Sequence, residues 1–271
     1  MMGSRAADGA ATIDGGTAGA RAPELGMIGS PHWARASAGS RPWTRLANLL
    51  RRVAVRSSTV CRQQRARLFL DRLRPGAADR ILDLGGGKGG YMAEILSHRA
   101  NVTIADVDPG MLRIAAESYG FGTLRLDGAA RLPIADGAYD IVFSSSVIEH
   151  ITGPHETVCK MTDGLVFAAS ARVAQARFAA ELRRVGKRYF VQTPYKYFPL
   201  EPHSFLPFVI VLLPRRWQVA LLAFCGRHWI KSVQPDFRLL TIREMRALFP
   251  DAEIVLERYC GFVKSIVAIK A

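Results

Sequence analysis

The sequence predicts an α/β fold whose central sheet is doubly wound, with helices on both faces. A short apolar run at residues 81–84 indicates a buried strand, and it leads directly into a glycine-rich loop. Apolar runs and helical segments then alternate through residues 101–192, an order typical of a mostly parallel sheet. The last two β-rich runs are separated only by Cys260-Gly261, which predicts a hairpin. We therefore expect seven strands, mostly parallel, with an antiparallel C-terminal hairpin.

Each expected strand is a short run of apolar, β-branched or aromatic residues. Residues 139–144 (Y-D-I-V-F-S) and 188–192 (R-Y-F-V-Q) illustrate the pattern. The expected strands are residues 81–84, 101–107, 123–126, 139–144, 188–192, 253–259 and 262–269.

The expected helices follow a capping signal or an apolar stripe at helical spacing. Asp108-Pro109 opens one helix, because aspartate caps a helix and proline is tolerated in its first turn. Thr241 is the N-cap expected for the last helix. Residues 152–170 show no clear pattern. The expected helices are residues 41–73, 91–96, 109–118, 171–185 and 241–249.

The chain divides into a tail, an arm and one domain. Residues 1–40 are rich in glycine, alanine and serine, so we expect them to be disordered. Residues 41–75 form a basic helical arm, which we expect to cover the domain rather than lie on a membrane surface. Residues 76–271 form the domain. Its insertion at residues 195–240 holds two apolar pieces that suit a lid or substrate pocket, with a membrane-interface patch as the alternative.

Positive charge is concentrated at the start of the chain. The formal net charge is +14, and residues 1–80 hold 14 arginines against five acids. Such a segment is attracted to anionic surfaces, so nucleic acid and acidic lipid are both candidate partners. Simple solubility is the alternative explanation.

The cysteines and the apolar runs indicate in which cellular compartment the protein is expected. The four cysteines are far apart and have no zinc spacing, so we expect free thiols in a reducing compartment and no metal. No run of 18 uncharged apolar residues is present, and the N-terminus has no signal-peptide pattern. We expect a cytoplasmic protein, with peripheral membrane contact as an option.

The glycine loop fits two kinds of ligand. Gly85, Gly87 and Gly90 match the dinucleotide pattern G-x-G-x-x-G. Asp83 followed by Gly85, Gly87 and Gly89 matches D-x-G-x-G-x-G instead. Both patterns bring backbone N–H groups and a helix N-terminus against a ligand.

Three further signals follow expected strands, at the edge where open α/β sheets bind ligands. Asp106, nineteen positions after Gly87, can accept hydrogen bonds from ribose hydroxyls. Asp127-Gly128 can bracket an adenine edge. The run L-P-I-A-D-G-A-Y-D-I-V-F-S-S-S-V-I-E-H then covers residues 132–150. An acid at Asp83 is unusual for a nicotinamide site, but it is well placed to receive a cationic amino group.

With these four motifs in order, the chain resembles the class I S-adenosylmethionine-dependent methyltransferases, in particular the type 11 group. The resemblance is dense over residues 80–143 and implies a Rossmann-like methyltransferase fold with S-adenosylmethionine as cofactor. Lys88 departs from the small residue usual at its position. The implied cofactor-binding residues are Asp83, Gly85, Gly87 and Gly89 for the methionine part, Asp106 for the ribose, Val107, Asp127 and Gly128 for the adenine, and Ser144 or Ser145 beside the methionine end.

Methyl transfer from a sulfonium requires alignment of the acceptor and exclusion of water. A hydroxyl acceptor also requires a base, and the candidates are Glu149, His150 and His203. The apolar insertion favours an apolar small-molecule, lipid-like or glycolipid acceptor, and we expect the methyl group to go to oxygen. The alternatives are an RNA or DNA methyltransferase that uses the arginine-rich arm, and a protein that binds S-adenosylmethionine without catalysis. The oligomeric state is open.

Overall fold

The computed structural model describes residues 42–271 apart from 99, 129–130, 202–203, 205 and 229–232. The predicted disordered tail, residues 1–40, lies outside the described residues. Side chains are described from Arg52 onward, except at 53–54 and 226–228 and at the gaps already named.

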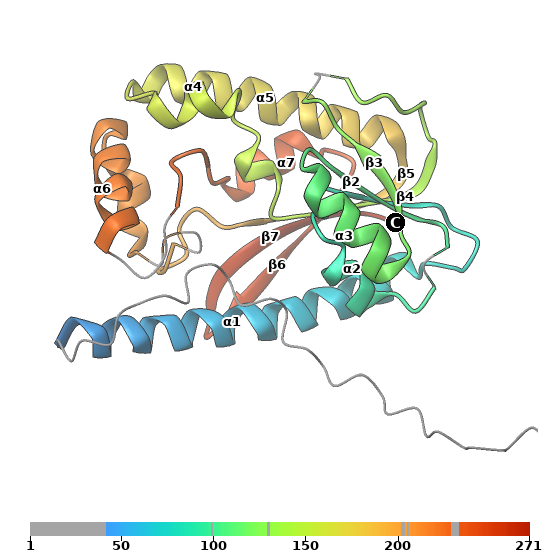
Figure 1. The fold of residues 1–271 in the computed structure, drawn as a ribbon, viewed down its shortest axis with the longest axis horizontal. Coiled ribbons are helices and arrows are strands. Elements are labelled where there is room, and N and C mark those ends of the chain that lie inside the picture. The colour runs from blue at the N-terminus through green and yellow to red at the C-terminus, as the bar shows by residue number, and fades with distance from the viewer. Residues whose placement is uncertain (1–41, 99, 129–130, 202–203, 205, 229–232) are drawn as a thin grey trace, which may run out of the picture.

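A seven-stranded sheet forms the centre of the molecule, with strand order β3-β2-β1-β4-β5-β7-β6 (Figure 1). Strands β1 to β5 pair in parallel, whereas β7 runs antiparallel to both β5 and β6. The predicted doubly wound, mostly parallel sheet with a C-terminal hairpin is thus confirmed. The strands are β1 (Ile81–Leu84), β2 (Val102–Asp106), β3 (Gly122–Arg125), β4 (Tyr139–Ser145), β5 (Gly186–Pro194), β6 (Glu253–Tyr259) and β7 (Phe262–Lys270).

The order of the strands reverses between β1 and β4. Strand β1 pairs with β2 on one side, where Leu84 is level with Ala105, and with β4 on the other, where Asp83 is level with Phe143. The loops that leave β1 and β4 therefore diverge from neighbouring strand ends, which is where doubly wound sheets bind ligands. The hydrogen bond from Gly85 N–H to the carbonyl of Ala105 (2.8 Å) anchors the glycine loop to β2.

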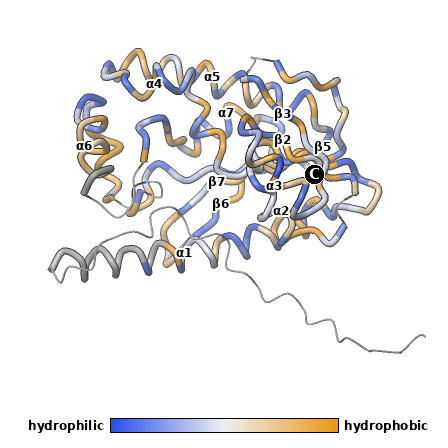
Figure 2. Tube along the Cα trace, viewed as in Figure 1, coloured by the Kyte–Doolittle hydropathy of each residue, from blue (hydrophilic) through white to orange (hydrophobic). Residues whose placement is uncertain are grey.

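Helices cover the sheet on both faces. On one face lie α1 (Pro42–Leu73), α2 (Gly90–Ile95) and α3 (Pro109–Tyr119), whose buried apolar residues pack with those of the strands. On the other face, α5 (Gly164–Val185) and α7 (Ile242–Leu248) close a second apolar cluster. Figure 2 shows apolar residues along the strands between these two layers.

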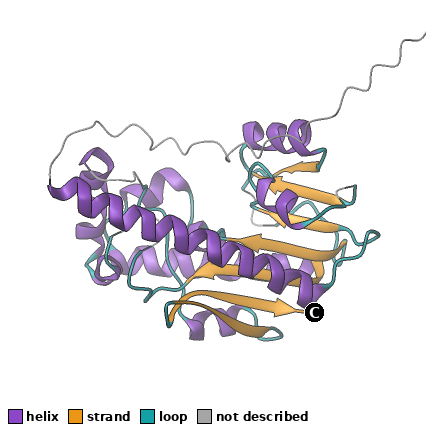
Figure 3. Cartoon of the chain, turned by 90° about the horizontal axis from the view of Figure 1, so that it is seen from below, coloured by secondary structure: helices purple, strands orange, loops and turns teal. Residues whose placement is uncertain are grey.

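Helix α1 crosses the sheet obliquely (Figure 3). Phe69 lies edge-on to two sheet residues, with its ring 5.2 Å from Phe143 and 5.6 Å from Phe190. Leu73 is also fully buried. The second half of the arm therefore shares the core of the domain, because aromatic edge contacts and apolar burial join the two.

Helix α5 begins at Gly164, seven residues before the predicted start at 171. Asp163 caps it by accepting hydrogen bonds from the N–H groups of Leu165 and Val166. The side chains of Leu165 and Val166 are largely exposed although they are apolar. The first turn of α5 therefore lacks the apolar-inside, polar-outside periodicity by which a helix is recognised in a sequence. A short helix, α4 (His155–Lys160), occupies part of the stretch that showed no pattern.

The insertion between β5 and α7 contains a 3₁₀ turn, η2 (Phe208–Leu212), and helix α6 (Arg215–His228). Ile210, Leu222, Phe237 and Leu239 form a small apolar cluster of its own. None of the helices in the described part of the chain is long and apolar enough to span a bilayer. The insertion is thus a separately packed layer at one end of the molecule (Figure 1).

The two predicted turn and cap signals near the C-terminus are confirmed. Thr241 caps α7 in a reciprocal capping box with Glu244, which satisfies two backbone donors at the helix start. Cys260 and Gly261 join β6 to β7 with φ values of 48° and 82°, the left-handed backbone that a two-residue hairpin requires.

Candidate functional site

The glycine loop turns sharply at the end of β1. Gly85, Gly87 and Gly89 have φ values of 79°, 56° and 73°, which side chains strongly disfavour. A Cβ at Gly85 would lie 2.5 Å from Val147, and one at Gly89 would lie 2.8 Å from Phe121. A Cβ at Gly87 would meet nothing within 4 Å. Two glycines thus permit close packing, and the third presents backbone to open space.

Asp83 lies directly beneath this loop. Its side chain is buried and points at Gly86, where a Cβ would clash with its Oδ2. Burial, together with the charge of Asp106, raises the pKa of Asp83 to about 7. A cationic group brought beside it would lower that pKa. The site therefore favours a ligand with a positive charge at this point.

Asp106, the last residue of β2, faces the same loop. Its Oδ2 accepts a hydrogen bond from Gly87 N–H (2.9 Å), and its Oδ1 accepts one from Asp108 N–H (3.0 Å). These two bonds fix the orientation of the carboxylate. Each oxygen keeps a further lone pair, so Asp106 can still accept hydrogen bonds from a diol.

An apolar cavity of about 290 Å³ opens at the carboxyl edge of the sheet. Val107 reaches it with a side chain that is 60% exposed. Asp127 and Gly128 follow β3 at the same edge, and both are exposed. The cavity is lined by Leu84, Gly85, Val107, Leu126, Val147, His150, Ile151, Gly153, His155, Val158, Phe178 and Asp236.

The two serines at the end of β4 take part in internal hydrogen bonds. Ser144 Oγ is buried and donates to the carbonyl of Leu84 (3.0 Å), which ties β4 to β1. Ser145 Oγ donates to Oε1 of Gln192 (2.8 Å) and accepts from Nη1 of Arg65 (2.9 Å). Ser145 thus connects β4, β5 and α1 at the edge of the site.

His150 and Glu149 follow β4 in a single 3₁₀ turn, but they face different surroundings. Glu149 is fully buried, and its Oε2 accepts a hydrogen bond from Thr193 Oγ1 (2.9 Å). His150 is 36% exposed at its side chain and lines the cavity. Its Nδ1 lies 3.3 Å from Oδ1 of Asp236. His203, the third predicted base, lies outside the described residues.

Asp236 is a member of the site that the sequence did not indicate. Burial alone would raise its pKa, but the hydrogen bond and charge of His150 hold the pKa of Asp236 below its usual value. Thr152 Oγ1 donates to the backbone carbonyl of Asp236 (2.6 Å) and so fixes the segment. The arrangement holds a carboxylate against one ring nitrogen of His150 and directs the rest of the ring to the cavity edge.

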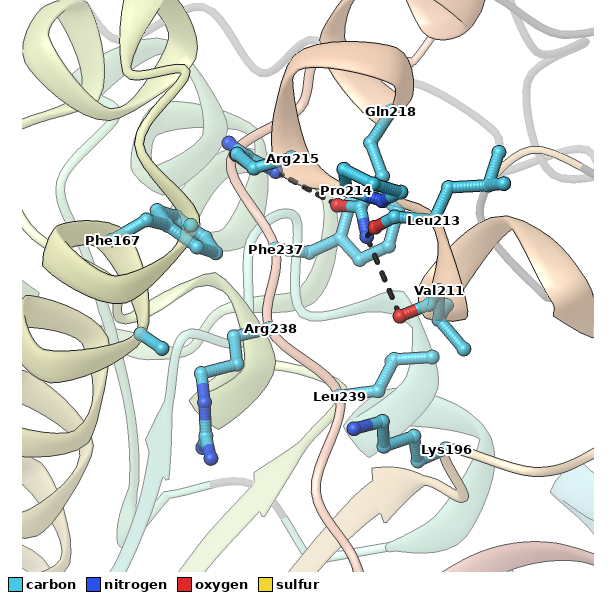
Figure 4. A pocket seen from close by; sticks show the side chains of 12 residues that line it. Phe167, Lys196, Val211, Leu213, Pro214, Arg215, Gln218, Phe237, Arg238 and Leu239 are labelled. Carbon is cyan, nitrogen blue, oxygen red and sulfur yellow. Dashed lines mark hydrogen bonds between the residues drawn. The ribbon is translucent and has the colours of Figure 1, made fainter.

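A second cavity, of about 270 Å³, separates the insertion from the start of α5 (Figure 4). Its walls mix the aromatic rings of Phe167 and Phe237 with the cations Lys196, Arg215 and Arg238. Arg238 is held by Gln175 and Glu244. The segment from Asp236 to Phe237 forms a wall that the two cavities share.

The described residues contain no group of three or more histidines, cysteines or acids arranged to hold a metal ion.

The cradle fits the cofactor that the motifs imply. Asp83 offers a buried carboxyl, whose pKa of about 7 would be lowered beside the ammonium of a methionine tail. Asp106 has a carboxylate fixed by two backbone N–H groups, which would suit a ribose diol, and the exposed Val107 side chain would suit an adenine ring. Gly87 presents its backbone to open space. These groups are compatible with the parts of S-adenosylmethionine that the resemblance assigns to them.

Comparison with known proteins agrees with this assignment. A family model described as a methyltransferase domain, Methyltransf_11, matches residues 82–165. Over 77 residues the chain is 36% identical to an uncharacterized methyltransferase of Mycolicibacterium gilvum, covering 27% of this chain and 30% of that protein. Over 91 residues it is 33% identical to the ubiquinone/menaquinone biosynthesis C-methyltransferase UbiE of Zymomonas mobilis, covering 31% and 38%. The match thus spans about a third of the length of either relative.

Solved structures also resemble the chain. The YcgJ protein of Bacillus subtilis has 16% identity and a TM-score of 0.46, with 72% of this chain and 71% of that chain covered. A SAM-dependent methyltransferase of Aquifex aeolicus has 16% identity and a TM-score of 0.39, with 70% and 80% covered. The match over residues 82–165, the motifs and the sheet order together support an S-adenosylmethionine-dependent methyltransferase.

Proposed function

We propose that the protein transfers a methyl group from S-adenosylmethionine to an oxygen of an apolar small-molecule, lipid-like or glycolipid acceptor. The observation that carries this proposal is the cavity of about 290 Å³ at the carboxyl edge of the sheet. Its walls are mostly aliphatic, yet the His150–Asp236 pair stands at its rim. The adenine of the cofactor would take the Val107 side of this cavity, and an apolar acceptor with one reactive hydroxyl would match the part beside the His150–Asp236 pair.

The cofactor, when bound, supplies a methyl group already activated on a sulfonium. The chain's own residues then bind and orient. In our proposal Asp83 holds the ammonium of the methionine tail and Asp106 holds the ribose. Val107 packs on the adenine, and Asp127 with Gly128 meets the adenine edge. Placing two reactants in a fixed geometry accounts for much of the acceleration of such a displacement.

His150 is the base that we favour for a hydroxyl acceptor. Asp236 fixes the ring through Nδ1 and supports the proton that the other ring nitrogen would take up. Glu149 is fully buried behind a hydrogen bond from Thr193, so we assign it to support of the turn that carries His150. In this proposal His150 takes up the proton and Glu149 supports the turn that carries it.

Carbon methylation is the second candidate, because the Zymomonas mobilis relative is named a C-methyltransferase of ubiquinone and menaquinone biosynthesis. A quinone-like ring would also suit aliphatic walls. The two candidates differ in the product, since an oxygen product carries a methyl ether or ester and a carbon product does not.

The test is a transfer assay with the full chain and S-adenosylmethionine labelled on the methyl group. The panel contains apolar phenols, quinol-type rings, a lipid extract and small polar acids. We expect label in the apolar acceptors, with stoichiometric S-adenosylhomocysteine and an added 14 Da by mass spectrometry. Labelling of polar acids alone would overturn the acceptor class. Tight cofactor binding without turnover on any acceptor would favour a non-catalytic binding protein.

A further inference from the structure

Large apolar side chains are exposed on the insertion and on the adjoining start of α5. Trp217 and Phe224 of α6 are 58% and 62% exposed, and Leu165 of α5 is 86% exposed. Trp217 and Phe224 are seven residues apart, so they project from the same face of the helix. We name this surface the apolar end; its exposed members are Leu165, Val166, Val209, Leu212, Leu213, Trp217 and Phe224.

The segments that carry these residues are in contact with one another. The starts of α5 and α6 are in contact, because a Cβ at Gly164 would lie 3.4 Å from Cβ of Arg215. Gln218 Nε2 donates to the carbonyl of Leu213 (2.9 Å) and so ties α6 to the turn before it. The apolar end is therefore built from three segments that contact one another, with Trp217 and Phe224 on the outer face of α6.

A buried arginine holds this patch from beneath. Arg215 is 6% exposed, and its guanidinium lies 3.8 Å from the centre of the Phe167 ring. It also donates hydrogen bonds to the backbone carbonyls of Val158, Met161 and Pro235. These contacts link α4, α5 and α6. The exposed side chains thus stand on an ordered support and are not a loose loop.

Exposed arginines lie near the apolar end. Arg216 of α6 is exposed, and the sequence of residues 202–235 contains four lysines and arginines, the buried Arg215 among them, and no acid. The first half of α1 carries four further arginines between residues 42 and 56, again without an acid, and Arg52 and Arg56 are exposed. That half of α1 and helix α6 lie at the same end of the long axis (Figures 1 and 3). Glu156 and Asp163 are the exposed acids of α4 and of the α5 cap.

We propose that the apolar end is a docking surface for an anionic phospholipid bilayer, with Trp217 and Phe224 inserted at the interface. Aromatic and aliphatic side chains beside basic ones are the combination that binds headgroups and the acyl boundary together. A second copy of the chain fits less well, because a symmetric contact would set the same basic helix against itself. The proposal does not depend on the methyl acceptor.

The test uses the full chain and vesicles that contain either phosphatidylcholine alone or phosphatidylcholine with phosphatidylglycerol. We expect flotation with the anionic vesicles only, weakened by high salt because screening removes the charge contribution. The double variant Trp217→Ser/Phe224→Ser should lose binding by about tenfold or more. Arg52→Gln/Arg56→Gln should lose mainly the salt-sensitive part.

The matched control is Val173→Ser, which removes an exposed apolar residue (52% exposed) farther along α5. Its binding should equal that of the unmodified protein. Cofactor affinity of every variant reports whether the fold is intact. Failure of the unmodified protein to bind anionic vesicles would overturn the proposal, as would undiminished binding by the double variant. A concentration-dependent dimer that the double variant abolishes would assign the surface to a second copy instead.

Discussion

Arg65 of α1 and Glu257 of β6 form a bidentate ion pair in the interior of the protein. Nε donates to Oε1 (3.0 Å) and Nη2 to Oε2 (2.9 Å), and both side chains are less than a tenth exposed. The remaining nitrogen, Nη1, donates to Ser145 Oγ at the end of β4 (2.9 Å). One guanidinium therefore joins the arm, the last hairpin and the edge of the cofactor site, across 192 residues of sequence.

Removal of the Glu257 charge should destabilise the protein strongly. Glu257→Gln leaves Arg65 charged and buried without its counter-charge, and loss of one partner of a buried pair costs about 3–5 kcal/mol. Urea unfolding followed by circular dichroism measures the change. Glu253→Gln is the matched control, because the Arg72–Glu253 pair also joins α1 to β6 but is half exposed. It should cost less than about 1 kcal/mol, and equal losses in the two variants would refute this account.

The sheet and much of the cradle were predictable because their signals are local. A run such as residues 139–144 is apolar wherever the rest of the chain lies, and a strand end followed by glycines or Asp106 falls at one edge of a parallel sheet by geometry. The order β3-β2-β1-β4-β5-β7-β6 then confirmed the predicted architecture. Lys88 occupies a loop position where the resemblance implies a small residue. It is exposed, and nothing in the structure explains why a lysine stands there.

The partners of the site residues were not predictable, because they depend on tertiary contacts between distant segments. Asp236 reaches His150 across 86 residues and Gln192 reaches Ser145 across 47. Neither pair has a sequence spacing from which the contact could be predicted. Ser144 also looked like Ser145 in sequence, but only the fold directs one hydroxyl to Leu84 and the other to the arm.

Asp83 should couple cofactor binding to pH. Its folded-state pKa is raised to about 7 from 3.8, so folding favours the protonated form and stability falls as pH rises through that window. A bound ammonium reverses the preference, because it stabilises the carboxylate. We expect S-adenosylmethionine affinity to decrease from pH 8 to pH 6, with proton release on binding at pH 6.5. Calorimetry in buffers of different ionisation enthalpy measures both.

The variant Asp83→Asn separates the two effects. It should be more stable than the unmodified protein at pH 8 in the absence of cofactor, since it removes a buried charge. The difference should vanish near pH 4, and affinity for S-adenosylmethionine should no longer depend on pH. A variant less stable at pH 8 would contradict the raised pKa.

Asp106 should determine cofactor affinity through the ribose. Asp106→Ala removes hydrogen bonds to a charged acceptor, each of which contributes about 1.5–3 kcal/mol, so affinity for both S-adenosylmethionine and S-adenosylhomocysteine should fall by about tenfold or more. Calorimetry with the two ligands measures the loss. Asp108→Asn is the control, because asparagine retains the capping of α3. An unchanged affinity in Asp106→Ala would show that the ribose lies elsewhere.

His150 and Asp236 should act on the chemical step and not on cofactor binding. For a hydroxyl acceptor, His150→Gln removes the base and should lower kcat by about 10²-fold or more. Asp236→Asn retains the volume but loses the charge that supports the ring, so we expect a smaller fall in kcat. The pKa of Asp236 is lowered, so the carboxylate stays charged through the neutral range. Its contribution should be lost only as pH falls through that lowered pKa.

The measurements are kcat, KM for S-adenosylmethionine and calorimetric affinity for S-adenosylhomocysteine on the same variants. Both variants should change kcat more than the two cofactor constants, although His150 and Asp236 line the same cavity as Val107. Thr193→Val is the control for Glu149. It removes the hydroxyl that donates to Glu149 Oε2 and leaves His150 unchanged. If His150→Gln retains full kcat on an oxygen acceptor, the proton is taken up elsewhere, and His203 becomes the residue to substitute next.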